Sequence, residues 1–487
     1  MGQFRGVAAR LTSGKGCQAQ AVTFTAVILG ILLLMGCGRP TPPPLILLIS
    51  FDTFRADALG VLTGMQPSLT PNLDQLAADS VLFENSFAHY PQTLPSHMSM
   101  VTGVYPGVHR VTPKNHRTHD GGSLPQGIAT LPELLRQAGY RTVGLVTTEW
   151  LKAEFGFGRG FDHYERLPHK LTYADRVSSA ALNKLDASAE DERPLFLFLH
   201  FYDAHSDFTQ GRKNKFPYYS PPAYREDLGT SDDGREFCDE QGRCDTQFLM
   251  AADTERRSFP DTEVRNILDL YRAGIKYLDA EVGPFLAELR TRELYDNAMI
   301  VVTSDHGEEF REHGRFIHSQ PYDETIRVPL LVKFPRSWRA GSRVAGVVET
   351  IDILPTILEY AGFAVPDHVQ GKSLIGLIGR EASGGLWVIS QDSIRTSRYC
   401  LRTARSKFII DLEGSSKELY DLDADPEERV NIISERPGLA EQLERKLIRT
   451  ILANRRLGEE FGVDKEGSPD VLSEEERETL KALGYLN

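Results

Sequence analysis

Three runs of apolar residues end abruptly at acidic residues. The runs cover residues 45–51, 195–201 and 298–303, with the sequences LILLISF, LFLFLHF and AMIVVT. Asp52 directly follows the first run, Tyr202-Asp203 follows the second, and Ser304-Asp305 follows the third. Continuous apolar runs of this length are typical of central parallel strands that are covered on both faces. We therefore predict three buried strands that carry carboxylates at their carboxyl ends.

Segments with helical periodicity alternate with these strands. We predict helices over residues 70–77, 130–138, 262–291 and 352–362, and further strands over 141–147 and 329–334. This alternation indicates an α/β fold with a central, mostly parallel sheet and helices on both faces. Beyond residue 365 the pattern indicates a smaller C-terminal α+β unit, with strands over 386–390, 399–402 and 407–411 and helices near 436–456 and 473–483.

These patterns divide the chain into four parts. They are a targeting segment (1–36), a proline-rich tether (37–44), a large α/β domain (45–364) and the C-terminal unit (365–487). Residues 208–260 are polar and rich in Gly, Pro and Asp, and we predict that they form a surface insertion that influences substrate choice.

The stretch from His89 to Gly103 predicts a short helix with a hydroxyl group at its start. Pro95 fits the first turn, Thr93 falls at or just before the N-cap, and Gly103 can end the helix in a left-handed conformation. A hydroxyl beside unpaired backbone N–H groups can hold a nucleophile against a phosphate or sulfate group. On this stretch alone, an ordinary capped helix is the favoured interpretation.

Composition and charge narrow the function classes. The chain has 487 residues, of which 41% are hydrophobic and 25% charged, as in folded globular proteins. Its net charge of −13 argues against a nucleic-acid-binding protein, because no basic surplus exists to displace counterions.

The N-terminus has the pattern of an export signal. Arg5, Arg10 and Lys15 precede an apolar core that ends in Leu34-Met-Gly-Cys37. The core is short for a membrane span, and it resembles a bacterial lipoprotein signal; an uncleaved anchor helix is the alternative. The resemblance implies that Cys37 is lipidated and anchors the protein outside the cytoplasm, on the periplasmic side or at the cell surface. The proline-rich tether then separates the lipid from the domain.

The other cysteines agree with export. Cys238 and Cys244 flank a five-residue loop that a disulfide can close in an oxidising compartment, whereas metal binding by the pair is the weaker alternative because no second pair exists. Cys400 is expected to be a buried free thiol.

Polar residues at the strand ends suggest a metal site. The carboxyl edge of an open α/β sheet is where ligands bind, and Asp52, Asp203 with His205, and Asp305 with His306 all fall there. Oxygen ligands suit Mg²⁺ or Ca²⁺, while an added imidazole favours Zn²⁺ or Mn²⁺. A metal that touches the Thr93 hydroxyl would make it a competent nucleophile at neutral pH.

Several segments, in this order, resemble the signatures of the sulfatase family, part of the alkaline-phosphatase-like superfamily. They are ISFDTFRAD (49–57), TPNLDQLA (70–77), Pro95-Ser-His with Thr102-Gly103, TSDHGE (303–308), RVPLL (327–331), DILPTIL (352–358) and ELYDL (418–422). The resemblance covers nearly all of residues 45–431. It implies an alkaline-phosphatase-like sandwich fold and metal-dependent ester hydrolysis.

Four positions depart from the family pattern. Thr93 stands where sulfatases oxidise a Cys or Ser to formylglycine, so no formylglycine is expected here. His97 replaces the arginine of that motif, Thr53 replaces the second Asp of a ligand pair, and His318 aligns with a lysine. A threonine nucleophile with two histidines resembles the nucleotide phosphodiesterases and phosphoethanolamine transferases of the superfamily, which attack phosphorus.

The resemblance implies specific roles. The metal ligands would be Asp52, Thr93, Asp305 and His306. The catalytic set would be Thr93, His97, His205 and His318. In this set His205 and His318 would bind the substrate oxygens or a second metal, with Asp203 as a further candidate ligand; structural, hydrogen-bonded histidines are the alternative.

Three functions stay open. The first is a hydrolase of sulfate or phosphate esters of a glycan, lipid or small molecule, with phosphate chemically favoured because threonine offers no gem-diol nucleophile. The second is a phosphoethanolamine-type transferase that acts on an envelope glycan or lipid. The third is a catalytically silent module that binds anionic glycans.

Overall fold

The computed structural model describes residues 42–462 except 116–119, 169–172, 188–190, 209–215, 227, 229–236, 239, 241, 243, 381–386, 393–396 and 415. These described residues form one compact unit. The targeting segment, Cys37 and the helix predicted near 473–483 lie outside the described residues. Within the described part, no helix is both long and apolar enough to cross a membrane.

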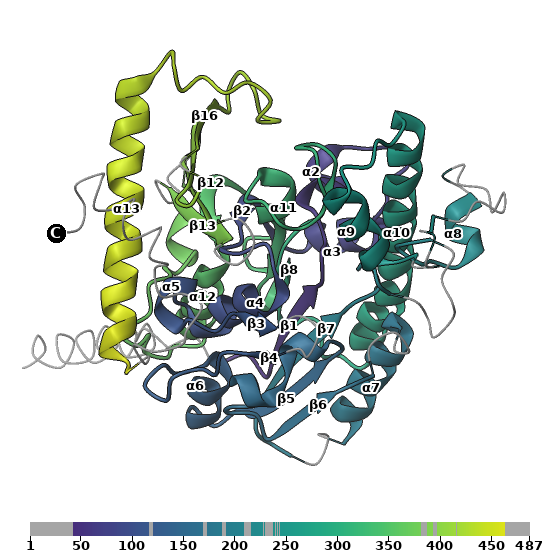
Figure 1. The fold of residues 1–487 in the computed structure, drawn as a ribbon. Helices are drawn as coiled ribbons and strands as arrows, with labels where there is room; N and C mark the ends of the chain where they lie inside the picture. Colours follow the sequence, from purple (N-terminus) through teal and green to yellow (C-terminus); the bar gives the residue numbers. More distant parts are fainter. Residues whose placement is uncertain are drawn as a thin grey trace, which may run out of the picture. The chain divides into compact units, whose positions relative to one another are not determined.

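An eight-stranded sheet forms the centre of this unit (Figure 1). Its strands, in spatial order, are β12 (Arg343–Glu349), β2 (Val81–Phe87), β11 (Arg327–Lys333), β8 (Met299–Ser304), β1 (Leu45–Phe51), β7 (Leu195–Phe201), β5 (Arg141–Val146) and β6 (His163–Arg166). All neighbours are parallel except β11, which is antiparallel to both β2 and β8. The predicted α/β fold with a mostly parallel sheet is confirmed.

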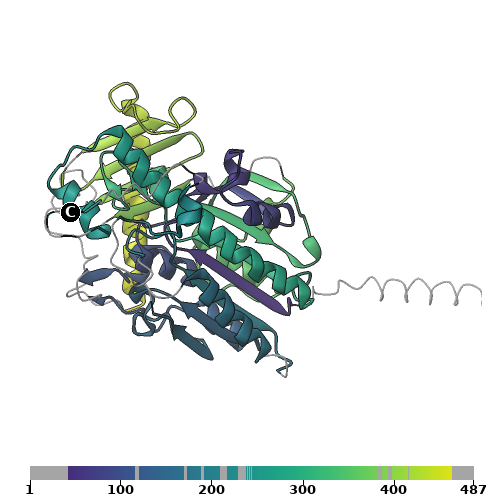
Figure 2. The ribbon, with the colours of Figure 1, turned by 90° about the vertical axis from the view of Figure 1, so that its right-hand side faces the viewer.

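Helices cover both faces of the sheet. Successive residues of a strand point to opposite faces, so one strand contributes side chains to both cores. In β1, Leu47 belongs to one core cluster and Leu48 to the other. The first cluster includes residues of α3 (Pro71–Ala78), α7 (Ala174–Asp186) and α10 (Asp261–Thr291); Figure 2 views the sheet from the side on which α10 lies. The second includes residues of α4 (Thr93–Thr102), α6 (Leu131–Gln137) and α12 (Ile353–Tyr360).

Local chemistry sets the ends of these helices. Thr130 and Glu133 form a capping box at the start of α6. Gly103 ends α4 with a φ of 70°, the left-handed conformation expected of a C-terminal glycine. The start of α4 differs from the prediction by one residue: Gln92 is the N-cap, and Thr93 is the first helical residue. The Thr93 hydroxyl is therefore not occupied in capping the helix.

A second, four-stranded antiparallel sheet forms the C-terminal part (Figure 1). Its strands follow the order β13 (Val388–Asp392), β14 (Arg398–Arg402), β15 (Ser406–Asp411) and β16 (Lys417–Asp421). The helix α13 (Pro437–Glu460) packs on this sheet through Leu443, Leu447 and Ile451. The predicted C-terminal sheet is present, with β16 as an additional strand.

Shorter elements complete the described part. They are α2 (Gly60–Thr63), α5 (Pro106–His109), α8 (Pro222–Glu226), α9 (Thr246–Thr254), α11 (Asp323–Ile326), and the short strands β3 (Pro113–Asn115), β4 (Asp120–Gly121), β9 (Glu309–Phe310) and β10 (Phe316–Ile317). Six 3-10 turns of three residues each lie at 56–58, 149–151, 153–155, 335–337, 350–352 and 375–377.

The segment 208–260 is more integrated than its polar composition predicts. It contains α8 and α9, and Tyr218 and Phe248 are buried in the core cluster on the α10 side. Cys238 and Cys244 form the disulfide that their spacing allows. Cys400, by contrast, is a buried free thiol, as predicted.

Candidate active site

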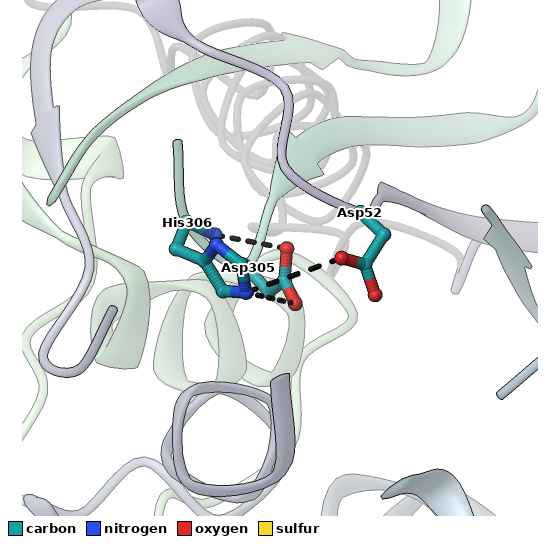
Figure 3. Close-up of side chains that lie close together, drawn as sticks. All are labelled: Asp52, Asp305 and His306. Atoms are coloured by element: carbon teal, nitrogen blue, oxygen red, sulfur yellow. Dashed lines mark hydrogen bonds and ion pairs between the residues drawn. The ribbon is translucent and has the colours of Figure 1, made fainter. Parts of the chain in front are cut away.

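The register of two strands brings Asp52 and Asp305 together. β1 and β8 are parallel and pair Phe51 with Ser304, so the next residue of each strand is an aspartate. Both aspartates are fully buried at the carboxyl edge of the sheet. His306 adjoins them, and Figure 3 shows the three side chains converging. Their possible ligand atoms all lie within 4.8 Å of one another.

The N-terminus of α4 places Thr93 against this cluster. The Thr93 Oγ1 donates to Asp52 Oδ2 at 3.3 Å and lies 3.5 Å from His306 Nε2. Ser96, in the same helical turn, donates from Oγ to the carbonyl of Asp305 at 2.6 Å and so ties the helix to the sheet edge. A helix N-terminus adds partial positive charge at this point. The structure thus joins a hydroxyl, two carboxylates and an imidazole that sequence reasoning selected independently.

The cluster fits a divalent cation. Asp52 Oδ1 and Asp305 Oδ2 are buried and have no hydrogen-bond partner among the described residues. His306 Nδ1 lies 2.9 Å from the carbonyl of Gly307, which can only accept, so this nitrogen carries a proton, and in the neutral ring that binds a metal Nε2 carries the lone pair. The Nε2 lone pair then faces Asp305 Oδ2 at 3.4 Å and Asp52 Oδ1 at 3.9 Å. Lone pairs that converge in this way, without a donor, are the arrangement of metal ligands.

His97 lies behind the nucleophile rather than in front of it. It is fully buried, with Nδ1 2.9 Å from the carbonyl of Thr93 and Nε2 2.8 Å from Ser50 Oγ. Its Nδ1 is also 3.4 Å from Asp305 Oδ2. Burial lowers the pKa of His97 to about 4, against the influence of Asp305. This placement favours positioning of Thr93 and Asp305 over direct contact with a substrate.

His200 belongs to the same cluster and was not among the candidates. It is fully buried in β7, and its Nε2 lies 3.2 Å from Asp52 Oδ2. Its ring packs edge-on against His97, with centroids 5.0 Å apart, and burial lowers its pKa to about 4. The signal was visible in the sequence: His200 is the one polar residue within the apolar run LFLFLHF.

His205 and His318 approach the cluster from two other segments. Their ring centroids are 5.5 Å apart, and His318 lies 4.3 Å from His306 by the same measure. Burial lowers the pKa of His205, but the charge and hydrogen bond of Asp207, at 2.8 Å, outweigh it and raise this pKa to about 9. A cationic imidazole therefore faces the cluster at neutral pH.

Glu308 is a second residue that sequence reasoning did not select as a candidate. Its Oε1 lies 3.1 Å from His318 Nδ1, and the carboxylate is fully buried. Burial raises the pKa of Glu308 to about 8. The Glu308 carboxyl group orients the His318 ring next to His306.

Thr53 and Asp203 point elsewhere. The Thr53 hydroxyl donates to the carbonyl of Ala204 at 3.2 Å, while its backbone N–H donates to Asp305 Oδ1 at 3.3 Å. Asp203 accepts from the backbone N–H of Ala174, at the start of α7, at 2.9 Å. Asp203 therefore accepts a hydrogen bond from the N-terminus of α7 and takes no part in the Asp52–Asp305 cluster.

A second group of possible ligands lies nearby but is already satisfied. Glu309, His313 and Glu324 meet the distance criterion for a metal site. The Glu309 carboxylate, however, accepts from the backbone N–H groups of His313 and Arg315 and from the amide of Gln320. Hydrogen bonds thus account for this group without a cation.

Taken together, fold and site define the class of protein. A carboxylate–imidazole cluster beside a helix N-terminal hydroxyl, at the carboxyl edge of a mostly parallel sheet, is the arrangement of the alkaline-phosphatase-like superfamily. The family model described as "Sulfatase" matches residues 44–363, and that of the "N-sulphoglucosamine sulphohydrolase, C-terminal" region matches residues 311–455. The chain belongs to the sulfatase family.

Individual relatives agree with this assignment. An arylsulfatase of Clostridium perfringens is 25% identical over 463 residues, which cover 80% of this chain and 90% of that protein. Arylsulfatase K of Mus musculus is 33% identical over 202 residues, which cover 39% of this chain and 36% of the mouse protein. The chain thus matches little more than a third of the length of Arylsulfatase K.

The fold likeness covers almost the whole described unit. A solved structure of a protein in complex with its substrate, D-glucosamine-2-N,6-O-disulfate, has a TM-score of 0.67 and 19% identity. The alignment covers 89% of this chain and all of that protein. At this identity the likeness supports the shared fold alone.

Proposed function

We propose that the protein is a metal-dependent hydrolase of sulfate or phosphate esters, with Thr93 as its direct nucleophile and phosphate esters as the chemically favoured substrates. One observation carries the proposal. The Thr93 hydroxyl lies 3.3 Å from Asp52 and 3.5 Å from His306, at the N-terminus of a buried helix. Family membership and the arylsulfatase relatives support ester hydrolysis.

The carboxylates need a counter-charge, and a divalent cation is the simplest. Asp52, Asp305, His306 and the Thr93 hydroxyl would hold it, and the imidazole favours Zn²⁺ or Mn²⁺ over Ca²⁺ or Mg²⁺. When bound, such a cation lowers the pKa of a hydroxyl ligand and neutralises charge that develops on the transferred group.

The chain's own residues supply the remaining steps. The Thr93 Oγ1 attacks phosphorus or sulfur and forms a covalent threonine ester, while the bond to the leaving oxygen breaks. Asp52 Oδ2, which already accepts from Thr93 Oγ1, takes the hydroxyl proton. The cationic His205 donates a proton to the leaving oxygen. Water then attacks the same central atom and gives a proton to His205, while the bond to Thr93 Oγ1 breaks and Asp52 returns its proton to that oxygen, so that phosphate or sulfate and the free threonine hydroxyl are released.

Threonine chemistry favours phosphorus. A formylglycine hydrate has a second hydroxyl through which it can expel sulfate, and a threonine ester has none. A phospho-threonine intermediate must instead be cleaved by water at phosphorus, the type of step for which positioning and charge neutralisation suffice. Sulfate esters remain substrates of the proposal because of the family to which the chain belongs.

The test is a comparison of matched aryl esters. The protein comprising residues 38–487 is stripped of metal, loaded with Mn²⁺ or Zn²⁺, and assayed with phosphate monoester, phosphodiester, phosphonate and sulfate esters. We expect phosphate-ester turnover, with sulfate far slower. Thr93→Ala should lower kcat by about 10⁴-fold or more, because a nucleophile acts as part of a unit.

Thr102→Ala provides the matched control. Thr102 lies in the same helix, is also buried, and donates to the carbonyl of Met98 at 2.6 Å. This variant should keep kcat. Faster sulfate than phosphate turnover would contradict the chemical preference, and a Thr93→Ala protein with native turnover would exclude Thr93. No turnover of any ester together with no bound metal would favour the silent binding module.

We further propose that lipidated Cys37 anchors the protein outside the cytoplasm. The lipoprotein-like signal motivates this proposal, and the Cys238–Cys244 disulfide is consistent with an oxidising compartment. Mass spectrometry of the membrane-extracted protein should find an acylated N-terminal cysteine. Cys37→Ser should release the protein from the membrane fraction, and an unmodified Cys37 would contradict the anchor.

A further inference from the structure

A chain of buried hydrogen bonds runs under the active site, along the carboxyl ends of three adjacent strands. It begins at Thr147, which directly follows β5, passes through His200 of β7, and ends at Asp52, which directly follows β1. The Thr147 Oγ1 is 2.9 Å from His200 Nδ1, and His200 Nε2 is 3.2 Å from Asp52 Oδ2. Thr147, His200 and Asp52 are all fully buried.

The direction of each bond follows from donor and acceptor chemistry. A carboxylate oxygen can only accept, so Nε2 of His200 carries a proton and donates to Asp52. In a neutral imidazole the other nitrogen, Nδ1, then accepts, and the Thr147 hydroxyl donates to it at 2.9 Å in preference to the backbone carbonyl of His200, which lies 3.2 Å away. A hydroxyl that donates to Nδ1 stabilises the tautomer with its proton on Nε2, which is the tautomer that His200 needs to hold Asp52.

The two oxygens of Asp52 are consequently unlike. Oδ2 accepts from the Thr93 hydroxyl and from His200, while Oδ1 is buried and has no partner among the described residues. Two donors on one oxygen fix the rotation of the carboxylate about its χ2 torsion. The unpartnered Oδ1 is left facing His306 Nε2 at 3.9 Å.

We propose that His200 is a positioning residue that orients the Asp52 carboxylate toward the cation through its Nε2–H group, and that Thr147 fixes the imidazole tautomer that provides this proton. The inference rests on the proposed metal role of Asp52. Under this proposal, β7 and β5 contribute to the metal site through His200 and Thr147. Removal of an outer partner of a metal ligand typically lowers metal affinity by 10- to 100-fold.

The test measures binding of Mn²⁺ and Zn²⁺ to the metal-free protein by equilibrium dialysis. His200→Leu removes the donor and should weaken binding by about 10- to 100-fold. His200→Gln retains a side-chain N–H near the position of Nε2 and should recover most of the affinity. The Leu variant leaves no stranded hydroxyl, since Thr147 Oγ1 has an alternative acceptor in the carbonyl of residue 200, at 3.2 Å.

A double-mutant cycle tests the role of Thr147. Thr147→Val keeps the shape of the side chain and should weaken metal binding in the native background. It should have no further effect in the His200→Gln background, because glutamine has no tautomer to select. Coupling of this kind is the measure of a direct interaction. The cycle also remains informative if His200→Leu fails to fold.

His109→Leu is the matched control. His109 is buried to the same degree and hydrogen-bonded to Ser99 Oγ at 3.0 Å, but it contacts neither aspartate of the cluster. A merely structural role for His200 predicts that both Leu variants lose thermal stability and keep native metal affinity, and this result would overturn the inference. Native metal affinity in Thr147→Val would overturn the tautomer assignment.

The outcome is separable from that of the proposed function. Weakened metal binding in His200→Leu without any ester turnover in the native protein would support the positioning role and contradict the hydrolase. Ester turnover in the native protein, together with native metal affinity in His200→Leu, would support the hydrolase and contradict the positioning role. A native protein that binds neither cation would contradict both.

Discussion

Two clusters of buried or largely buried carboxylates differ in how their charge is compensated. One is the active-site cluster of Asp52, Asp305 and His306, which has no Lys or Arg ion pair among the described residues. The other, which we call the inter-sheet cluster, consists of Asp323, Arg402, Lys407 and Glu428. There Lys407 Nζ lies 2.9 Å from Asp323 and 2.8 Å from Glu428, and Arg402 lies 3.2 Å from Asp323.

The inter-sheet cluster balances two cations with two carboxylates. Lys407 and Arg402 come from β15 and β14 of the C-terminal sheet, while Asp323 begins α11 of the main unit. Although burial opposes it, the charges of Lys407 and Arg402 hold the pKa of Asp323 well below its usual value. Such a cluster is complete without a ligand. The active-site cluster is incomplete without one, and this difference separates a structural charge cluster from a functional one.

The largest effect on stability is expected from a substitution that breaks the charge balance of the inter-sheet cluster. Lys407→Met keeps most of the side-chain length but leaves two buried carboxylates with one remaining cation. Breaking a buried ion pair in this way costs about 3–5 kcal/mol. Denaturant unfolding of the metal-free protein measures the loss, while kcat of the folded variant should stay close to native.

Lys417→Met is the control for this prediction. Lys417 pairs with Glu444 at 2.8 Å, but its side chain is 31% exposed. Partly exposed pairs contribute about 1 kcal/mol or less. Equal losses in the two variants would show that the inter-sheet cluster contributes no more than a surface pair.

The opposite result is expected at the active site. Asp305→Asn removes a charge that lacks a cationic partner, so the metal-free protein should keep or gain stability. The same change should weaken Mn²⁺ or Zn²⁺ binding by more than about 100-fold, since it alters a ligand rather than a supporting residue. Because metal binding is lost, addition of metal should no longer raise the melting temperature of the Asp305→Asn protein.

Asp279→Asn makes the same substitution where both carboxylate oxygens accept hydrogen bonds, whereas Asp305 has Oδ2 without a hydrogen-bond partner among the described residues. Asp279 is buried and accepts from the backbone N–H groups of Asn72 and Leu73, at 3.0 and 2.8 Å. We expect this variant to lose stability and keep metal affinity. A metal-free Asp305→Asn protein that is destabilised as much as Asp279→Asn would show that Asp305 needs no counter-charge.

The sequence predicted the active-site cluster better than the inter-sheet cluster, for a physical reason. Asp52 and Asp305 each follow a continuous apolar strand, and parallel strands end at a common edge, so their meeting could be expected from the chain itself. Lys407 and Asp323 meet only through the packing of two sheets, about which local patterns contain no information. His200 is recognisable in the sequence as the polar residue of its apolar strand. Its contact with Asp52, however, could not be predicted without the register of β7 and β1.

The limits of the pattern are also visible in the fold. β2 and β12 escaped prediction because polar residues, such as Glu84 and Asn85 in β2, interrupt their apolar positions toward the sheet edge. The segment 208–260 has a polar composition, yet it buries Tyr218 and Phe248 in the core. The average composition of a segment does not reveal the few large apolar side chains that determine whether the segment packs into the core.

Asp203 shows a third way to bury a carboxylate, by retaining a proton. Burial raises the pKa of Asp203 to about 7, and its Oδ2 has no hydrogen-bond partner among the described residues. Since the unfolded chain releases this proton near pH 4, the folded state binds more protons between about pH 4 and pH 7. Asp203 therefore favours folding at low pH, and this contribution is lost as the pH rises toward 7.

Asp203→Asn should remove this pH dependence. Between pH 5 and pH 8 the stability of the variant relative to the native protein should rise by about 2–3 kcal/mol, which corresponds to two pKa units. Unfolding in denaturant at both pH values measures it. Asp175→Asn, at an exposed position in the first turn of α7, should show a much smaller trend, because Asp175 only adds to the rise in the pKa of Asp203. A relative stability that does not change with pH would mean that Asp203 is ionised in the folded protein, and that its burial is compensated by the N-terminus of α7 instead of by a proton.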